Sequence, residues 1–91
     1  MTDERLSLYV RPLCGACMIV CRVIERLGLP VEFRDIREHR AWYDELVEAR
    51  GRGTTPVLRI DHPDGYTTWM PESRDIIAWL NDRFVAGAVD D

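Results

Sequence analysis

The sequence predicts an α/β domain, because strand-like and helix-like patterns of apolar residues follow one another along the chain. Residues 31–36 alternate with a period of two, and apolar residues recur at helical spacing over 15–27. Two strands joined through a helix form a βαβ unit with parallel strands. The turn Asp64-Gly65 before a β-rich run predicts an antiparallel hairpin. These features predict the order β-α-β-α-β-β-α in one four-stranded mixed sheet with helices on both faces.

Turn and breaker residues mark the boundaries of the predicted elements. In chain order, the predicted elements are a strand over 6–10, a turn over 11–14, a helix over 15–27, a strand over 31–36, a helix over about 39–50, a strand over 56–60, a turn over 62–65, a strand over 66–69 and a helix that begins near 71–72. Gly28 followed by Pro30 ends the first helix, and Gly51 breaks the chain before the third strand. Residues 86–91 form a small acidic tail that we expect to fray.

Length and composition predict one small domain. The 91 residues are 46% hydrophobic, which is enough for one core, so we expect a single domain over 1–91. No stretch approaches the roughly 20 apolar residues of a membrane span, and the N-terminus is charged, so we expect a cytoplasmic protein with no membrane partner. The net charge of −4 offers no basic field for nucleic acid. We expect a monomer.

The motif Cys14-Gly15-Ala16-Cys17 lies between the first strand and the first helix and is the strongest chemical signal. Its spacing brings two thiols within reach of a disulfide, and the free N–H groups of a helix start stabilise a thiolate at Cys14. In a cytoplasmic chain such a pair is more typical of catalysis than of structure. A zinc half-site shares the spacing, but no second paired motif follows, so we expect no metal. A purely structural pair of buried thiols is the other alternative.

The dipeptide Thr55-Pro56 opens the third predicted strand. Proline cannot donate to a sheet ladder, so it must lie at an edge or at the start of a strand. A cis bond here would turn the Thr55 backbone outward, where it can pair with a peptide-like ligand as an added strand does. The alternative is a trans proline that only opens the strand.

Three motifs cover nearly the whole chain: Tyr9-Val10-Arg11-Pro12-Leu13-Cys14-Gly15-Ala16-Cys17, Thr54-Thr55-Pro56-Val57-Leu58 and Glu72-Ser73-Arg74-Asp75-Ile76-Ile77-Ala78-Trp79-Leu80. Together they resemble the glutaredoxin family, and the last is similar to the glutathione-binding helix start of glutathione S-transferase N-terminal domains. The resemblance implies a thioredoxin-like fold in which Pro56 is the family's cis-proline. The sequence departs from glutaredoxins in having Gly15-Ala16 where they commonly have Pro-Tyr or Pro-Phe.

By this resemblance, two cysteines would carry the chemistry. Cys14 would be the nucleophile that attacks the glutathione-side sulfur of a mixed disulfide, and Cys17 would be the more buried resolving thiol. Arg11 lies where the family carries a basic residue three positions before the nucleophile. It would favour the thiolate and attract a glutathione carboxylate, unless it is only a solvated surface arginine.

The resemblance also implies where glutathione would bind. The backbone of Thr55, beside Pro56, would pair with the cysteinyl part of the ligand. Glu72 and Ser73 match the transferase pair that holds the γ-glutamyl end, where free N–H groups of the helix start suit a carboxylate. The alternative is that these two side chains only cap the helix.

The sequence therefore predicts an enzyme, a thiol–disulfide oxidoreductase that uses glutathione or a related low-molecular-weight thiol as co-substrate. Its other partners would be disulfide-containing or thiolated proteins, and no cofactor would be tightly bound. One alternative is a thioredoxin-like reductase for a dedicated protein partner. Another is a non-enzymatic carrier that holds an iron–sulfur cluster between two chains.

Three further residues near the motif have open roles. Met18 and Ile19 either form an exposed docking patch for a protein disulfide or pack in the core. Cys21 is a small apolar filler, a surface thiol or an alternative resolving thiol.

Overall fold

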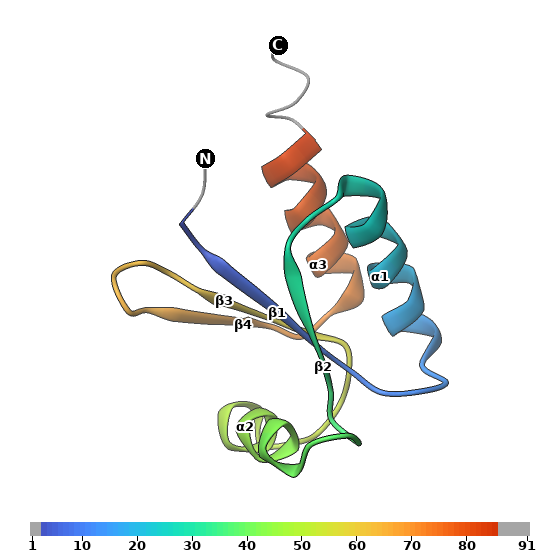
Figure 1. The fold of residues 1–91 in the computed structure, drawn as a ribbon, viewed down its shortest axis with the longest axis vertical. Helices are drawn as coiled ribbons and strands as arrows, with labels where there is room; N and C mark the ends of the chain where they lie inside the picture. The colour runs from blue at the N-terminus through green and yellow to red at the C-terminus, as the bar shows by residue number, and fades with distance from the viewer. Residues whose placement is uncertain (1–2, 86–91) are drawn as a thin grey trace.

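The computed structural model describes residues 3–85, in which three helices cover the two faces of one sheet (Figure 1). The elements are β1 (Arg5–Val10), α1 (Gly15–Leu27), β2 (Val31–Asp35), α2 (Arg40–Arg50), β3 (Val57–Asp61), β4 (Thr67–Met70), α3 (Ser73–Leu80) and the π-helical turn η1 (Asn81–Val85). The predicted order and the four-stranded mixed sheet are confirmed. The acidic tail over 86–91 lies outside the described residues.

The sheet has the strand order β2-β1-β3-β4. The β1 and β2 strands are parallel, as the βαβ pattern predicts, and β3 and β4 form the predicted antiparallel hairpin. The β1 strand also pairs antiparallel with β3, with Tyr9 opposite Val57, and Leu58 of β3 lies opposite Met70 of β4. The ends of β1 and β4 and the start of β3 therefore lie at the same end of the sheet.

Two apolar clusters, one on each face of the sheet, hold the layers together. On one face α1 and α3 lie side by side, and their buried residues Val20, Ile24 and Ile76 pack on Leu8 and Leu58 of the sheet (Figure 1). On the other face α2 packs through Leu46 against Tyr9, Val57 and Ile36. Burial of apolar area of this kind is the main favourable contribution to folding.

The α1 helix begins and ends where the sequence predicts. Cys14 is its N-cap residue, in an extended conformation, and its side chain accepts a hydrogen bond from the backbone N–H of Cys17. Gly28 ends the helix with φ of 67°, a left-handed conformation that glycine adopts without steric penalty. Within residues 3–85, no helix is both long and apolar enough to cross a membrane.

The second strand differs from its prediction. It ends at Asp35, and Ile36 is buried just beyond it, against the α2 side of the sheet. Phe33 is 42% exposed although its period-two pattern predicts a buried face. The physical reason is that β2 is an edge strand, so its side chains have a neighbouring strand on one side only.

Candidate functional site

Three loops meet at the end of the sheet where β1 and β4 finish and β3 begins. The first carries Cys14, the second carries Thr55 and the third carries Glu72 at the start of α3. The strand pairs Tyr9–Val57 and Leu58–Met70 fix these loops next to one another. The sheet topology thus gathers residues from three distant parts of the sequence.

Cys14 and Cys17 form a disulfide at the N-terminus of α1. Cys14 is half-buried, whereas Cys17 is 3% exposed, which is the asymmetry expected of an accessible first thiol and a protected second one. The backbone N–H of Cys17 lies 3.2 Å from the Sγ of Cys14. In the reduced protein this N–H and the positive end of the helix dipole favour a thiolate at Cys14.

Thr55 lies directly beside this sulfur. Its hydroxyl oxygen is 3.7 Å from the Sγ of Cys14, and its carbonyl oxygen is 3.9 Å from the same sulfur. The peptide bond between Thr55 and Pro56 is cis. The two residues that the sequence singles out, Cys14 and Thr55, are therefore neighbours across 41 positions of sequence.

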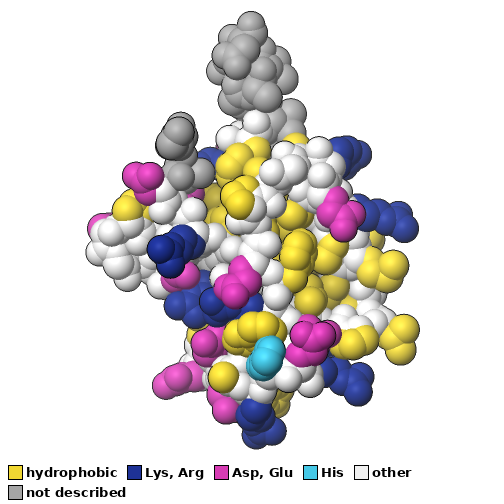
Figure 2. All heavy atoms as spheres, viewed as in Figure 1, with side chains coloured by type: hydrophobic (Ala, Val, Ile, Leu, Met, Phe, Trp, Pro, Cys, Tyr) yellow, Lys and Arg dark blue, Asp and Glu magenta, His cyan; other side chains and the backbone are white. Residues whose placement is uncertain are grey.

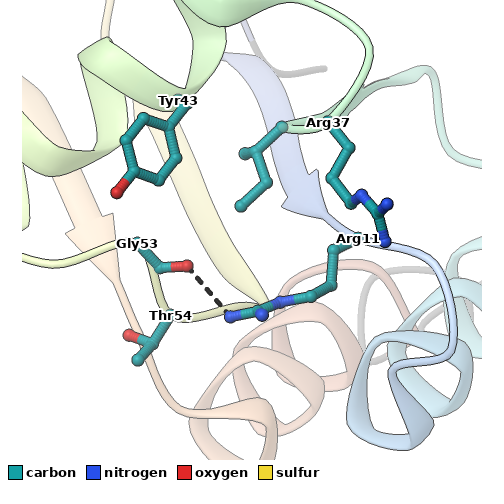
Figure 3. Close-up of a pocket in the computed structure, with 6 residues that line it drawn as sticks. Arg11, Arg37, Tyr43, Gly53 and Thr54 are labelled. Carbon is teal, nitrogen blue, oxygen red and sulfur yellow. Dashed lines mark hydrogen bonds between the residues drawn. The ribbon is translucent and has the colours of Figure 1, made fainter.

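Arg11 reaches toward the loop before β3. Its Nε donates to the hydroxyl oxygen of Thr55 at 3.2 Å, and its Nη2 donates to the carbonyl oxygen of Gly53 at 3.2 Å (Figure 3). That Arg11 favours the Cys14 thiolate stays a prediction, and the hydrogen bonds that its guanidinium makes go to the 53–55 loop.

A cleft of about 390 Å³ opens between Arg11, the start of α2 and this loop. Figure 3 shows the Tyr43 ring next to Gly53 on one side of the cleft, and Arg37 on the other side, extending from the segment between β2 and α2. Sequence reasoning missed Arg37 and Tyr43. The one sequence signal for this contact is the glycine at position 53, because glycine is common where another group approaches the backbone closely. In the structure, a Cβ on Gly53 would lie 2.6 Å from the Tyr43 ring.

Glu72 and Ser73 lie where the sequence predicts, at the start of α3. Glu72 is the exposed N-cap residue, and its side chain makes no capping hydrogen bond. Its carbonyl oxygen accepts the backbone N–H of Ile76 at 2.9 Å, so its role in the helix start is a backbone one. The alternative that the Glu72 side chain only caps the helix is therefore not supported.

An apolar surface borders the cysteine pair. Leu13 is fully exposed, and Met18 and Ile19 are 56% and 55% exposed, so neither of the latter packs in the core. In Figure 2, hydrophobic side chains are visible at the surface on the side of the molecule where α1 lies. A groove of about 360 Å³ runs along this side and includes Cys21. Burial raises the pKa of the Cys21 thiol, and the charge of Glu25 raises it further.

No three His, Cys, Asp or Glu side chains within residues 3–85 are placed so that they could hold a metal ion.

Comparison with known families decides the family of the chain. The sequence profile described as "Glutathione S-transferase, N-terminal domain" matches residues 8–87. This chain belongs to that family. The similarity of its last helix start to transferase N-terminal domains is thereby confirmed. None of the curated proteins matches the chain.

Solved structures agree with the family in fold. Maleylacetoacetate isomerase from Anaeromyxobacter dehalogenans, determined with bound GSH, superposes with a TM-score of 0.68 at 23% identity over 92% of this chain and 39% of its own. Glutathione transferase Omega 2S from Trametes versicolor gives 0.70 at 18% identity, over 92% and 38%. The thioredoxin-like protein BC3987 gives 0.58 at 23% identity, over 70% and 84%. The chain thus has the thioredoxin-like fold of transferase N-terminal domains and spans about two fifths of the isomerase and of the Omega transferase.

Proposed function

We propose that this transferase-family domain is a thiol–disulfide oxidoreductase that reduces mixed disulfides with glutathione or a related low-molecular-weight thiol. The observation that carries the proposal is the position of Cys14. Its sulfur caps α1, accepts the Cys17 N–H at 3.2 Å and lies within 3.9 Å of Thr55. A thiolate so placed is stabilised, partly accessible and followed one turn later by a second thiol.

In the proposed reaction, the Cys14 thiolate attacks the glutathione-side sulfur of a protein–glutathione mixed disulfide. A Cys14–glutathione disulfide forms, and the protein thiolate leaves and takes a proton from water. A second glutathione thiolate then attacks the bound glutathione sulfur, which releases oxidised glutathione and restores the Cys14 thiolate. With a protein disulfide as substrate, the Cys14 thiolate attacks one of its sulfurs to form a mixed disulfide and releases the other sulfur as a thiol. Cys17 then attacks the Cys14 sulfur, the Cys14–Cys17 disulfide forms and the substrate leaves as a dithiol. Two glutathione molecules reduce that disulfide again and leave as oxidised glutathione.

We place the thiol co-substrate along the three loops at this end of the sheet. The Thr55 backbone would pair with its cysteinyl part beside Pro56, and the helix start at Glu72 and Ser73 would hold the γ-glutamyl end. There, the backbone N–H groups of α3 suit the carboxylate, and the Glu72 carboxylate suits the ammonium group. A carboxylate at the other end of the thiol would enter the cleft that Arg11 and Arg37 line.

The test is turnover of a glutathionylated peptide with glutathione and glutathione reductase. Wild-type protein and Cys21→Ser should be active, and Cys14→Ser should be inactive. Cys17→Ser should keep part of the deglutathionylation activity and lose the reduction of protein disulfides. Equal turnover by wild type and Cys14→Ser would contradict the proposal.

Two further experiments distinguish the alternatives. Reduction of a protein disulfide with electrons from thioredoxin reductase, without glutathione-dependent turnover, would assign a dedicated thioredoxin-like reductase. A brown, dimeric protein after anaerobic purification, without turnover, would assign an iron–sulfur carrier.

Binding by the α3 start is tested separately. Glu72→Ala combined with Ser73→Ala should raise the KM for glutathione roughly tenfold with kcat largely kept, because the lost contacts are charge-assisted hydrogen bonds. Asp75→Ala is the matched control, since Asp75 is another exposed acid in the first turn of α3. An equal change in both variants would mean that the charge of the helix start matters and that specific contacts with the ligand do not.

A further inference from the structure

We propose that Arg11 is a positioning residue that orients the side-chain hydroxyl of Thr55, and that this hydroxyl is a second hydrogen-bond donor to the Cys14 thiolate. The inference rests on the proposed function for its biological purpose. It goes further in assigning the Thr55 side chain, in addition to its backbone, to the reacting sulfur.

The number of hydrogen bonds that the Thr55 hydroxyl can donate and accept determines where its proton points. The hydroxyl has one proton to donate and two lone pairs that accept. The Nε–H of Arg11 occupies one lone pair of the Thr55 oxygen at 3.2 Å. The hydroxyl proton remains free, and the Cys14 sulfur lies 3.7 Å from the oxygen, within reach of a hydrogen bond to sulfur. Arg11 thus favours the rotamer in which the proton faces the sulfur.

Thr55 offers a partner to both protonation states of Cys14. In the thiol state, the S–H group can donate to the Thr55 carbonyl oxygen, 3.9 Å away. In the thiolate state, the sulfur accepts only, and its donors are the Cys17 N–H at 3.2 Å and the Thr55 hydroxyl. Removing the hydroxyl therefore destabilises the thiolate form, whereas the Thr55 carbonyl oxygen that accepts from the thiol form stays in place.

The second hydrogen bond of Arg11 explains why an arginine suits this position. Its Nη2 donates to the carbonyl oxygen of Gly53 at 3.2 Å, so the planar guanidinium holds the loop at two points. A lysine would keep the charge but has a single ammonium group, which cannot reproduce this fixed two-point geometry. Charge and position can therefore be separated by substitution.

Substitutions at Thr55 leave the charged side chains of the neighbouring elements unchanged. The charged groups on the neighbouring elements are Arg11 in the loop after β1, Arg37 in the loop after β2 and Glu72 at the start of α3. Arg22 and Glu25 of α1 line the groove that contains Cys21. Thr55→Val removes one hydroxyl at nearly constant volume, so a change in Cys14 reactivity reports the lost donor.

The experiment measures the rate of Cys14 alkylation by iodoacetamide against pH in reduced protein, with the label located by mass spectrometry. In Thr55→Val the midpoint of the profile should rise by about one pH unit, the size expected for the loss of a hydrogen bond to a charged group. Thr55→Ser should restore the wild-type midpoint, and Arg11→Lys should give an intermediate value. Thr54→Val is the matched control, because Thr54 is an exposed neighbour in the same loop.

A Thr55→Val profile equal to wild type would overturn the inference. So would an Arg11→Lys profile equal to wild type together with a raised midpoint in Arg11→Gln, because charge alone would then account for Arg11. Circular dichroism of each variant establishes that it is folded, and Thr55→Ala, which also removes the hydroxyl, gives the answer if valine unfolds the loop. The assay needs no glutathione, so a wild type that fails to turn over peptide but shows the Thr55 effect would contradict the proposed function alone.

Discussion

Leu13, immediately before the nucleophile, combines two unfavourable features in one residue. Its φ is 60°, a left-handed conformation in which the Cβ of an ordinary residue is crowded, and its side chain is fully exposed. Backbone strain of this kind persists where the surrounding structure imposes it, and it often occurs at functional sites. Here the imposed turn presents an apolar side chain beside Cys14.

Relief of this strain should be measurable as stability. We expect Leu13→Asn to raise the free energy of unfolding by about 0.5–1 kcal/mol, because asparagine tolerates the left-handed conformation and the exposed leucine gives little burial energy. Urea unfolding of the reduced proteins measures the change. Leu13→Ala, which keeps a Cβ in the same conformation, is the control and should stay close to wild type. Equal stability of the two variants would show that φ at this position carries no strain.

At the scale of elements, a polar network around Tyr9 joins α2 to the sheet. The Tyr9 side chain is fully buried, and its hydroxyl donates to Glu45 of α2 at 2.7 Å. It accepts from Arg34 of β2 at 2.9 Å and from Arg59 of β3 at 3.3 Å. Burial raises the pKa of Tyr9; the hydrogen bond from Arg59 opposes this rise, and the one to Glu45 adds to it. Every group in the network thus has a partner on another element.

Loss of the Tyr9 hydroxyl should weaken the attachment of α2 to the sheet and so lower stability. We expect Tyr9→Phe to lower the free energy of unfolding by about 1–2 kcal/mol, the cost of a lost hydrogen bond plus partners left less well satisfied. Thermal or urea unfolding measures it, with Tyr66→Phe as the control because Tyr66 is 66% exposed. A destabilisation of similar size in the control would contradict the role of the network.

The same residue predicts a dependence on alkaline pH. Since folding raises the Tyr9 pKa, the folded state holds the proton more tightly than the unfolded state. This contribution is complete below the ordinary tyrosine pKa of about 10 and is lost as the pH rises through the folded value. Wild type should therefore lose stability more steeply above about pH 10 than Tyr9→Phe does. Parallel curves for the two proteins would contradict the expectation.

Local sequence signals predicted those elements that depend on local interactions. The α1 helix has its predicted bounds because the N-cap at Cys14 and the stop at Gly28 are both encoded within the segment. The strand over 31–36 was less well predicted, because the burial of Phe33 depends on whether the strand is central or at an edge. That position follows from the strand order, which periodicity does not contain.

In the candidate site, too, the local features were predicted and the long-range ones were not. The cysteine pair lies within four consecutive residues and was predicted. The hydrogen bond from Arg11 to Thr55 spans 44 positions and depends on β3 lying beside β1. No local pattern carries that information, so the sequence did not predict this hydrogen bond.

At the scale of the whole molecule, α1, α3 and the sheet share one cluster of buried apolar residues, and this packing positions the site. We expect the domain to unfold in one transition, with tryptophan fluorescence and far-UV circular dichroism coinciding, because Trp42 and Trp69 report on the α2 side and Trp79 on the α3 side. Separate transitions for the two probes would contradict a single cooperative unit.

The packing of α3 on the sheet is tested by substitution. Ile76→Ala should lower the free energy of unfolding by roughly 2–5 kcal/mol, since Ile76 is fully buried. Ile77→Ala, at a half-buried position, should lower it by less.

The N–H of Cys17 that bonds the Cys14 sulfur has a thermodynamic consequence beyond reactivity. It is held in place only in the folded chain, so the fold changes the balance between dithiol and disulfide relative to an unfolded peptide of the same sequence. Linkage is reciprocal: any preference of the folded protein for one redox form equals the difference in unfolding free energy between the two forms. The redox balance of the surroundings therefore sets how firmly this domain is folded, and a folded domain in turn holds its cysteine pair at a ratio that the free peptide would not adopt.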